Sequence, residues 1–60
     1  MSVHFNEAAT PGRWWCRAGR HYVECYVDRG RWVVLVDGVE QFTAASLQRA
    51  EREVEDRLAP

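Results

Sequence analysis

The segment from Trp32 to Val36, with the sequence Trp-Val-Val-Leu-Val, constrains the fold of this 60-residue chain more than any other. An unbroken apolar run rich in β-branched residues predicts a β-strand. Successive side chains of a strand point to opposite faces of its sheet, so a strand with one face in water should alternate apolar and polar residues. This segment does not alternate. We therefore expect both of its faces to be covered, one by a helix of the same chain and the other by a second surface.

The length predicts a single small domain over residues 1–60, at the lower limit of independent stability, where one core contributes about 3–5 kcal/mol. A composition of 47% hydrophobic and 28% charged residues is that of a globular domain and not of a disordered chain. The sequence shows no signal peptide and no transmembrane stretch, so we expect a cytoplasmic protein without membrane association.

A first hairpin is predicted to join residues 13–18 to residues 21–28 through Gly19-Arg20, because glycine suits the first central position of a two-residue type II′ turn. In that register the core face carries Trp14, Cys16, Ala18, Val23, Cys25 and Val27. The other face carries Arg13, Trp15, Arg17, Tyr22, Glu24, Tyr26 and Asp28.

A second hairpin, through Asp28-Arg29-Gly30, has two alternatives. A two-residue Arg29-Gly30 loop gives a core face of Trp32, Val34 and Val36, whereas a three-residue loop places Val33 and Leu35 there. The three-residue loop is favoured, because arginine is a poor residue for positive φ at the first position of a type I′ turn. Either register leaves an apolar set on the far face.

Residues 43–59 are predicted to contain a helix, from about Ser46 to Leu58, with Thr43 and Ser46 as candidate N-caps. Its apolar stripe is Leu47, Ala50, Val54 and Leu58, and i,i+4 ion pairs are expected at 49–53, 52–56 and 53–57.

Residues 1–12 are either flexible or form a short edge strand near Ser2–Phe5. Asp37-Gly38 is predicted to end the strand at Arg31–Val36, and Val39–Phe42 is either a connector or a short further strand. The predicted fold is α+β: a three-stranded antiparallel meander over residues 13–37 with one amphipathic C-terminal helix on one face.

Cys16 and Cys25 are interpreted as two reduced core cysteines, since their predicted separation of about 7–8 Å is long for a disulfide. A disulfide and a metal site with His21 and His4 are the alternatives. No Cys-x2–4-Cys pair is present to begin a metal site, and no catalytic motif is recognisable. We therefore expect no enzymatic activity, no metal and no cofactor.

The predicted outer face combines aromatic and arginine side chains with one apolar set of the 32–36 strand. Tryptophan, tyrosine and arginine are enriched at protein–protein hot spots and also suit contacts with nucleic acids. The candidate partner-binding residues are Arg13, Trp15, Arg17, Tyr22, Tyr26, Arg31, Val34 and Leu35. Residues 13–31 hold more arginines than acids, although the net charge of the chain is −1.

The order of features in residues 21–58 resembles the HicB-like antitoxin family. The matching elements are a Tyr-x-Val strand at Tyr22–Val27, a tight turn at Asp28–Gly30, the Trp32–Val36 strand, Gly38, Thr43, and Ser46-Leu47 opening an Ala/Glu-rich helix. The resemblance implies a degenerate RNase-H-like fold without catalysis, which binds a small HicA-like ribonuclease toxin and associates with itself. The strand that usually follows the helix in that family, and its ribbon-helix-helix DNA-binding segment, have no counterpart in these 60 residues.

Three functions therefore compete. The leading hypothesis is a small non-catalytic protein-binding module, antitoxin-like, whose sheet face binds a protein partner or a second copy in a homodimer. The alternative is a nucleic-acid-binding regulator that resembles the arm-binding domains of integrases and uses Arg13, Arg17, Arg20, Arg29 and Arg31. The third is a structural subunit of a larger assembly.

Overall fold

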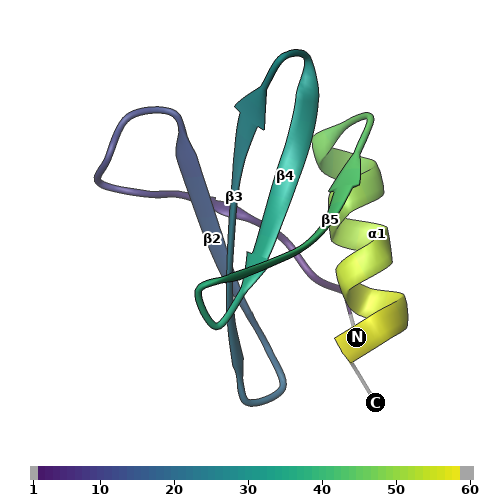
Figure 1. Ribbon diagram of the computed structural model, residues 1–60. Helices are drawn as coiled ribbons and strands as arrows, with labels where there is room; N and C mark the ends of the chain where they lie inside the picture. The colour runs from purple at the N-terminus through teal and green to yellow at the C-terminus, as the bar shows by residue number, and fades with distance from the viewer. Residues whose placement is uncertain (1, 59–60) are drawn as a thin grey trace.

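The computed structural model describes residues 2–58, which form one antiparallel sheet of five strands and one helix (Figure 1). The elements are β1 (Asn6–Glu7), β2 (Arg13–Ala18), β3 (His21–Asp28), β4 (Arg31–Val36), β5 (Val39–Ala44) and α1 (Leu47–Leu58). Strands adjacent in the chain are adjacent in the sheet, so the sheet is a meander. The predicted α+β class and the C-terminal helix are confirmed, but the prediction of three strands is wrong because β1 and β5 add one strand at each edge.

The first hairpin has the predicted register. Ala18 pairs with His21, Cys16 with Val23 and Trp14 with Cys25. Gly19 has φ of 61°, whereas Arg20 does not take positive φ, as a type II′ turn requires.

The second hairpin uses the register that the sequence did not favour. Asp28 pairs with Arg31 and Cys25 with Val34, so the loop consists of Arg29 and Gly30 alone. Both loop residues have positive φ, 53° and 77°, as in a type I′ turn. The twist of this turn matches the right-handed twist of the strands, and the fold holds an arginine in a conformation that favours glycine. Trp32, Val34 and Val36 therefore face the core, and Val33 and Leu35 face outward.

Strand β5 follows from a third tight turn, at Asp37-Gly38. Asp37 and Gly38 have φ of 53° and 84°, and Val36 pairs with Val39 directly across them. Asp-Gly thus reverses the chain and does not merely end a strand. An irregularity between Val34 and Leu35 in the β4–β5 pairing gives β5 an extra residue, as in a β-bulge.

Helix α1 begins as the sequence predicts at one of its two candidate caps. The Ser46 Oγ accepts a hydrogen bond from the Arg49 backbone N–H at 3.1 Å, so Ser46 is the N-cap. Thr43 lies in β5 instead, where its Oγ1 accepts a hydrogen bond from the Arg31 Nε at 3.3 Å. Of the three expected i,i+4 ion pairs, Glu53–Arg57 is present within residues 2–58, at 2.7 Å.

The N-terminal segment is not the edge strand expected near Ser2–Phe5. The backbone N–H groups of Val3 and Phe5 donate hydrogen bonds to the carboxylates of Glu55 and Glu51, at 3.2 and 2.8 Å. These contacts hold the segment against α1, and it passes behind the sheet in the view of Figure 1. In this part of the chain, strand pairing begins only at β1.

The core lies between the sheet and α1, where Val23, Val34, Val54 and Cys25 are fully buried. Cys16 and Cys25 are free and buried, as the sequence predicted. Burial raises the pKa of the Cys16 thiol to about 11 and that of the Cys25 thiol to about 12. Partly buried Trp14 and Trp32 pack on this core in an edge-to-face contact, with ring centroids 5.1 Å apart.

Candidate functional site

The outer sheet face is the side of the sheet opposite α1. Because side chains alternate along each strand, the observed register assigns its members without ambiguity. They are Arg13, Trp15 and Arg17 of β2, Tyr22, Glu24, Tyr26 and Asp28 of β3, Arg31, Val33 and Leu35 of β4, and Glu40 and Thr43 of β5. The face contains every sequence-predicted site residue except Val34.

Val34 is the one candidate that the structure removes. It is 0% exposed and belongs to the core between the sheet and the helix, because the two-residue turn reverses the register that was favoured. Leu35, which the favoured register placed on the core face, faces outward instead and is partly buried.

The outer face is ordered by two aromatic contacts. The rings of Trp15 and Tyr22 are stacked, with centroids 6.1 Å apart and an interplanar angle of 17°. The Arg13 guanidinium lies 4.7 Å above the Tyr26 ring centroid, at the distance of a cation–π interaction. These contacts restrict four large side chains before any partner binds, which reduces the conformational entropy that a partner must remove.

The exposed apolar surface that β4 contributes to the outer sheet face is smaller than the sequence predicted. Val33 is only 7% exposed, and its cross-strand neighbours are Tyr26 and Thr43. Leu35 lies between Glu24 and Glu40. The expectation that a second surface must cover both outward residues is therefore wrong for Val33, which its own sheet already covers, and it applies only to Leu35.

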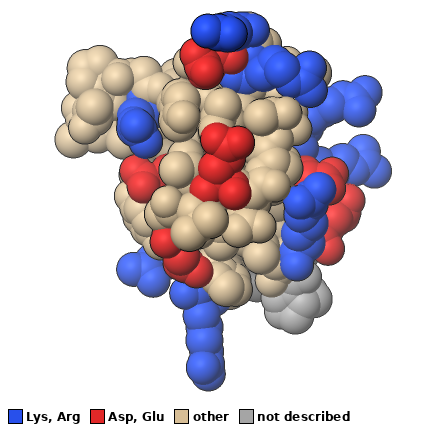
Figure 2. All heavy atoms as spheres, viewed as in Figure 1, with Lys and Arg blue, Asp and Glu red and all other residues tan. Residues whose placement is uncertain are grey.

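Charges of both signs share the outer sheet face. Arg13, Arg17 and Arg31 are balanced by the acidic Glu24, Asp28 and Glu40. In the view of Figure 2, acidic side chains lie near the middle of a mostly uncharged surface, and the basic side chains lie around its edge. Two further arginines of the sequence-predicted basic group, Arg20 and Arg29, lie in turns at the ends of strands. The arrangement is not a continuous basic surface.

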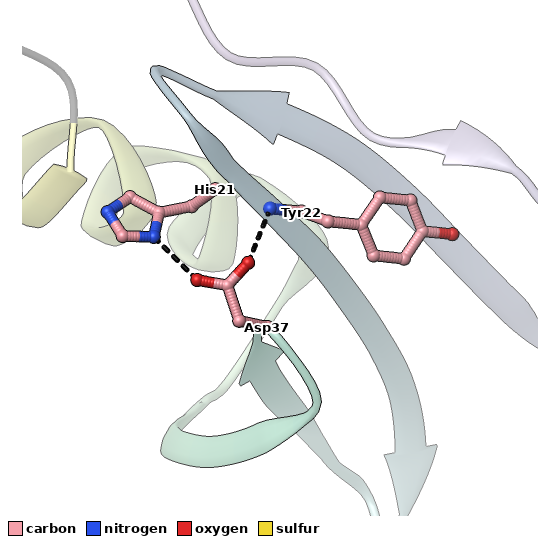
Figure 3. A network of polar contacts seen from close by, with 3 residues as sticks. All are labelled: His21, Tyr22 and Asp37. Atoms are coloured by element: carbon pink, nitrogen blue, oxygen red, sulfur yellow. Dashed lines mark hydrogen bonds and ion pairs between the residues drawn. The ribbon is translucent and has the colours of Figure 1, made fainter.

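A polar cluster that the sequence interpretation missed lies at the start of β3 (Figure 3). The Asp37 Oδ2 lies 2.7 Å from the His21 Nδ1, and its Oδ1 accepts a hydrogen bond from the Tyr22 backbone N–H at 3.0 Å. The hydrogen bond from His21, followed by that from Tyr22, lowers the pKa of Asp37. The sequence feature that could have indicated this cluster is the Asp37-Gly38 turn, which lies beside the start of β3 because Val36 pairs with Val23.

Two negative findings concern residues 2–58. In this part of the chain no three histidine, cysteine or acidic side chains are grouped so that they could hold a metal ion. Helix α1 is too short and too polar to cross a membrane, and no other helix occurs in the described residues.

Comparisons of this chain with protein-family models, with curated proteins and with solved structures found no match.

Proposed function

We propose that this protein is a small protein-binding module that associates through its outer sheet face. The observation that carries the proposal is the arrangement of that face: a stacked Trp15–Tyr22 pair and an Arg13–Tyr26 pair beside outward-facing Leu35. Preordered aromatic and arginine side chains around an apolar centre are typical of the residues that contribute most to protein–protein affinity.

The charge of the face favours a protein over a nucleic acid as its partner. Binding to a phosphate backbone depends on several arginines or lysines that each neutralise a phosphate. On the outer sheet face, Glu24 and Glu40 flank Leu35 at the centre and would repel a polyanion.

A second copy of the chain is the simplest partner for this face. Three arginines and three acids give it equal numbers of both charges, so two copies related by a twofold axis can place opposite charges against each other. A toxin-like protein, as the resemblance to HicB-like antitoxins implies, would bind the same face by the same contacts.

Sedimentation of the pure protein over a wide concentration range tests the proposal. We expect a reversible monomer–dimer equilibrium that weakens only moderately between about 50 and 200 mM salt, because salt screens the paired charges but not the apolar and aromatic contacts. Binding to several phosphates weakens by orders of magnitude over the same range. A strict monomer that binds a short DNA duplex in a salt-dependent manner would instead support the nucleic-acid alternative.

Two neighbouring substitutions locate the interface. Leu35→Glu adds a charge on the outer sheet face, so it should leave the protein folded and shift the equilibrium to the monomer. Val34→Glu, one residue earlier, places an unpaired charge in the core and should unfold the protein. Circular dichroism measures the fold of both variants, and a folded Leu35→Glu variant that dimerises like the wild type would refute the assignment of the face.

A further inference from the structure

A second candidate site lies on the helix side of the sheet, at the end of the molecule where β3 begins, β4 turns into β5 and α1 ends. It is a cleft of about 370 Å³ that opens to solvent. Its apolar wall consists of Val36, Val39, Phe42 and Leu58, from β4, β5 and α1. Val39 is 60% exposed, which makes it the most exposed large apolar side chain of residues 2–58.

Polar groups line the rim of the same cleft. His21 and Gln41 belong to strands of the sheet, Asp37 to the turn between β4 and β5, and Arg57 to the helix. The Arg57 guanidinium lies 4.4 Å above the Phe42 ring, and its Nε donates a hydrogen bond to Glu53 at 2.7 Å. Its two terminal amino groups make no hydrogen bond to residues 2–58, so within this part of the chain both can donate to a ligand.

The Asp37 carboxylate determines which ring nitrogen of His21 donates a hydrogen bond and which can accept one. An ionised carboxylate only accepts hydrogen bonds, so the Nδ1 of His21, 2.7 Å from Asp37, must carry the hydrogen. In the neutral imidazole the other nitrogen, Nε2, is then an acceptor. Figure 3 shows that this nitrogen points away from Asp37, and no other hydrogen bond to the His21 ring is present in residues 2–58.

The charged groups at the cleft already have partners, Asp37 with His21 and Arg57 with Glu53. A neutral ligand therefore leaves these pairs intact. It needs an apolar body for the wall, a hydroxyl hydrogen for the His21 Nε2 and a hydroxyl oxygen for an Arg57 amino group. A phenol combines all three in one group, and a volume of about 370 Å³ is within the range of small-molecule sites.

We propose that this cleft binds a small phenolic molecule, with the ring against Val39 and Phe42 and the hydroxyl between His21 and Arg57. The site lies on the opposite side of the sheet from the outer sheet face, so it is independent of the protein-binding function.

The test is a titration of the isotope-labelled protein with p-cresol, followed by the chemical shifts of its backbone amides. We expect saturable shifts at residues 21, 36–42 and 57–58. 4-Methylanisole has the same ring and keeps the oxygen acceptor but lacks the hydroxyl hydrogen, so it should bind about two- to tenfold more weakly, the range of one net hydrogen bond. Toluene, which lacks the oxygen, should bind at least as weakly as 4-methylanisole.

Two valine variants supply the matched control. Val39→Glu places a charge on the apolar wall and should abolish p-cresol binding. Val27→Glu changes a valine that is also exposed, at 48%, but pairs with Trp32 away from the cleft, and it should bind p-cresol as the wild type does. The proposal is overturned if the three ligands bind equally, if the shifts lie on the outer sheet face, or if both variants bind p-cresol equally. Should Val39→Glu unfold, the comparison of the three ligands on the wild type decides the question.

Discussion

Replacing Arg29 should stabilise the protein, although it is a surface residue in a turn. Arg29 has φ of 53°, and its side chain makes no hydrogen bond or ion pair within residues 2–58. Left-handed backbone costs an L-residue about 1–2 kcal/mol, and glycine avoids that cost. Glycine also gives the unfolded chain more conformational freedom, which lowers the free energy of unfolding by about 0.4–1 kcal/mol. We therefore expect Arg29→Gly to raise the free energy of unfolding by about 0.5–1 kcal/mol.

The expected change is large on the temperature scale because the chain is short. Unfolding entropy is about 2.1 cal/mol/K per residue, or roughly 0.13 kcal/mol/K for 60 residues. A gain of about 0.5–1 kcal/mol then raises the Tm by about 4–8 °C. Thermal denaturation followed by circular dichroism measures the shift. Arg29→Asn should give a similar gain, since asparagine tolerates this conformation.

Arg20→Gly is the matched control for Arg29→Gly. It removes the same charge from the other arginine-containing turn, but Arg20 does not have positive φ, so glycine there only adds freedom to the unfolded chain. Its Tm should fall or stay unchanged. An equal rise in both variants would show that charge, and not backbone conformation, causes the stabilisation, and a lower Tm for Arg29→Gly would refute the strain argument.

Three further predictions concern a cap, an ion pair and the thiols. Ser46→Ala removes the N-cap of α1 and should lower the free energy of unfolding by about 1 kcal/mol in urea denaturation, whereas Ser46→Asp, which can still cap, should not. The lowered pKa of Asp37 contributes stability that is present above the usual carboxyl pKa and is lost as the pH falls through the folded value, so Asp37→Asn should make the acid limb of a stability–pH curve shallower. Cys16 and Cys25, with pKa values raised to about 11 and 12, should resist iodoacetamide at neutral pH until urea unfolds the protein, and mass spectrometry would count the modified thiols.

The sequence predicts the local features of this fold well wherever one residue type dominates the choice. Gly19 specifies the first turn and its register, and Ser46 specifies the start of α1. The second turn was predicted wrongly because the prediction relied on the preference of arginine at position 29 to avoid positive φ. Burial of Trp32, Val34 and Val36 between sheet and helix requires the two-residue loop and overrides that preference.

The two edges of the sheet were harder to predict than its centre. The first three residues of β5, Val39–Gln41, are all exposed, so this strand lacks the apolar alternation that marks a half-buried strand. The N-terminal segment is held by Glu51 and Glu55, which are distant in sequence and lie in α1. No local pattern in residues 2–5 encodes those hydrogen bonds.

The two candidate sites differ in how much of them the sequence could show. The members of the outer sheet face on β2 and β3 follow from strand alternation and were identified from the sequence. On β4 the favoured register was wrong, so Val34 is buried and Leu35 faces outward. The cleft on the helix side joins His21, Val39 and Arg57, which come from three elements. Their proximity depends on two turns and on the position of the helix end, and none of these is visible in a linear pattern.

The contact between Trp14 and Trp32 gives the protein an intrinsic optical reporter. Two indoles with centroids 5.1 Å apart are close enough for their excited states to couple, so we expect a paired band in the circular dichroism spectrum. The coupling needs β2 and β4 in place on either side of β3, so the band records formation of the whole meander without a label. Trp15, on the other side of the sheet, stacks on Tyr22 and does not take part in that contact, so the paired band reports the helix side of the sheet alone.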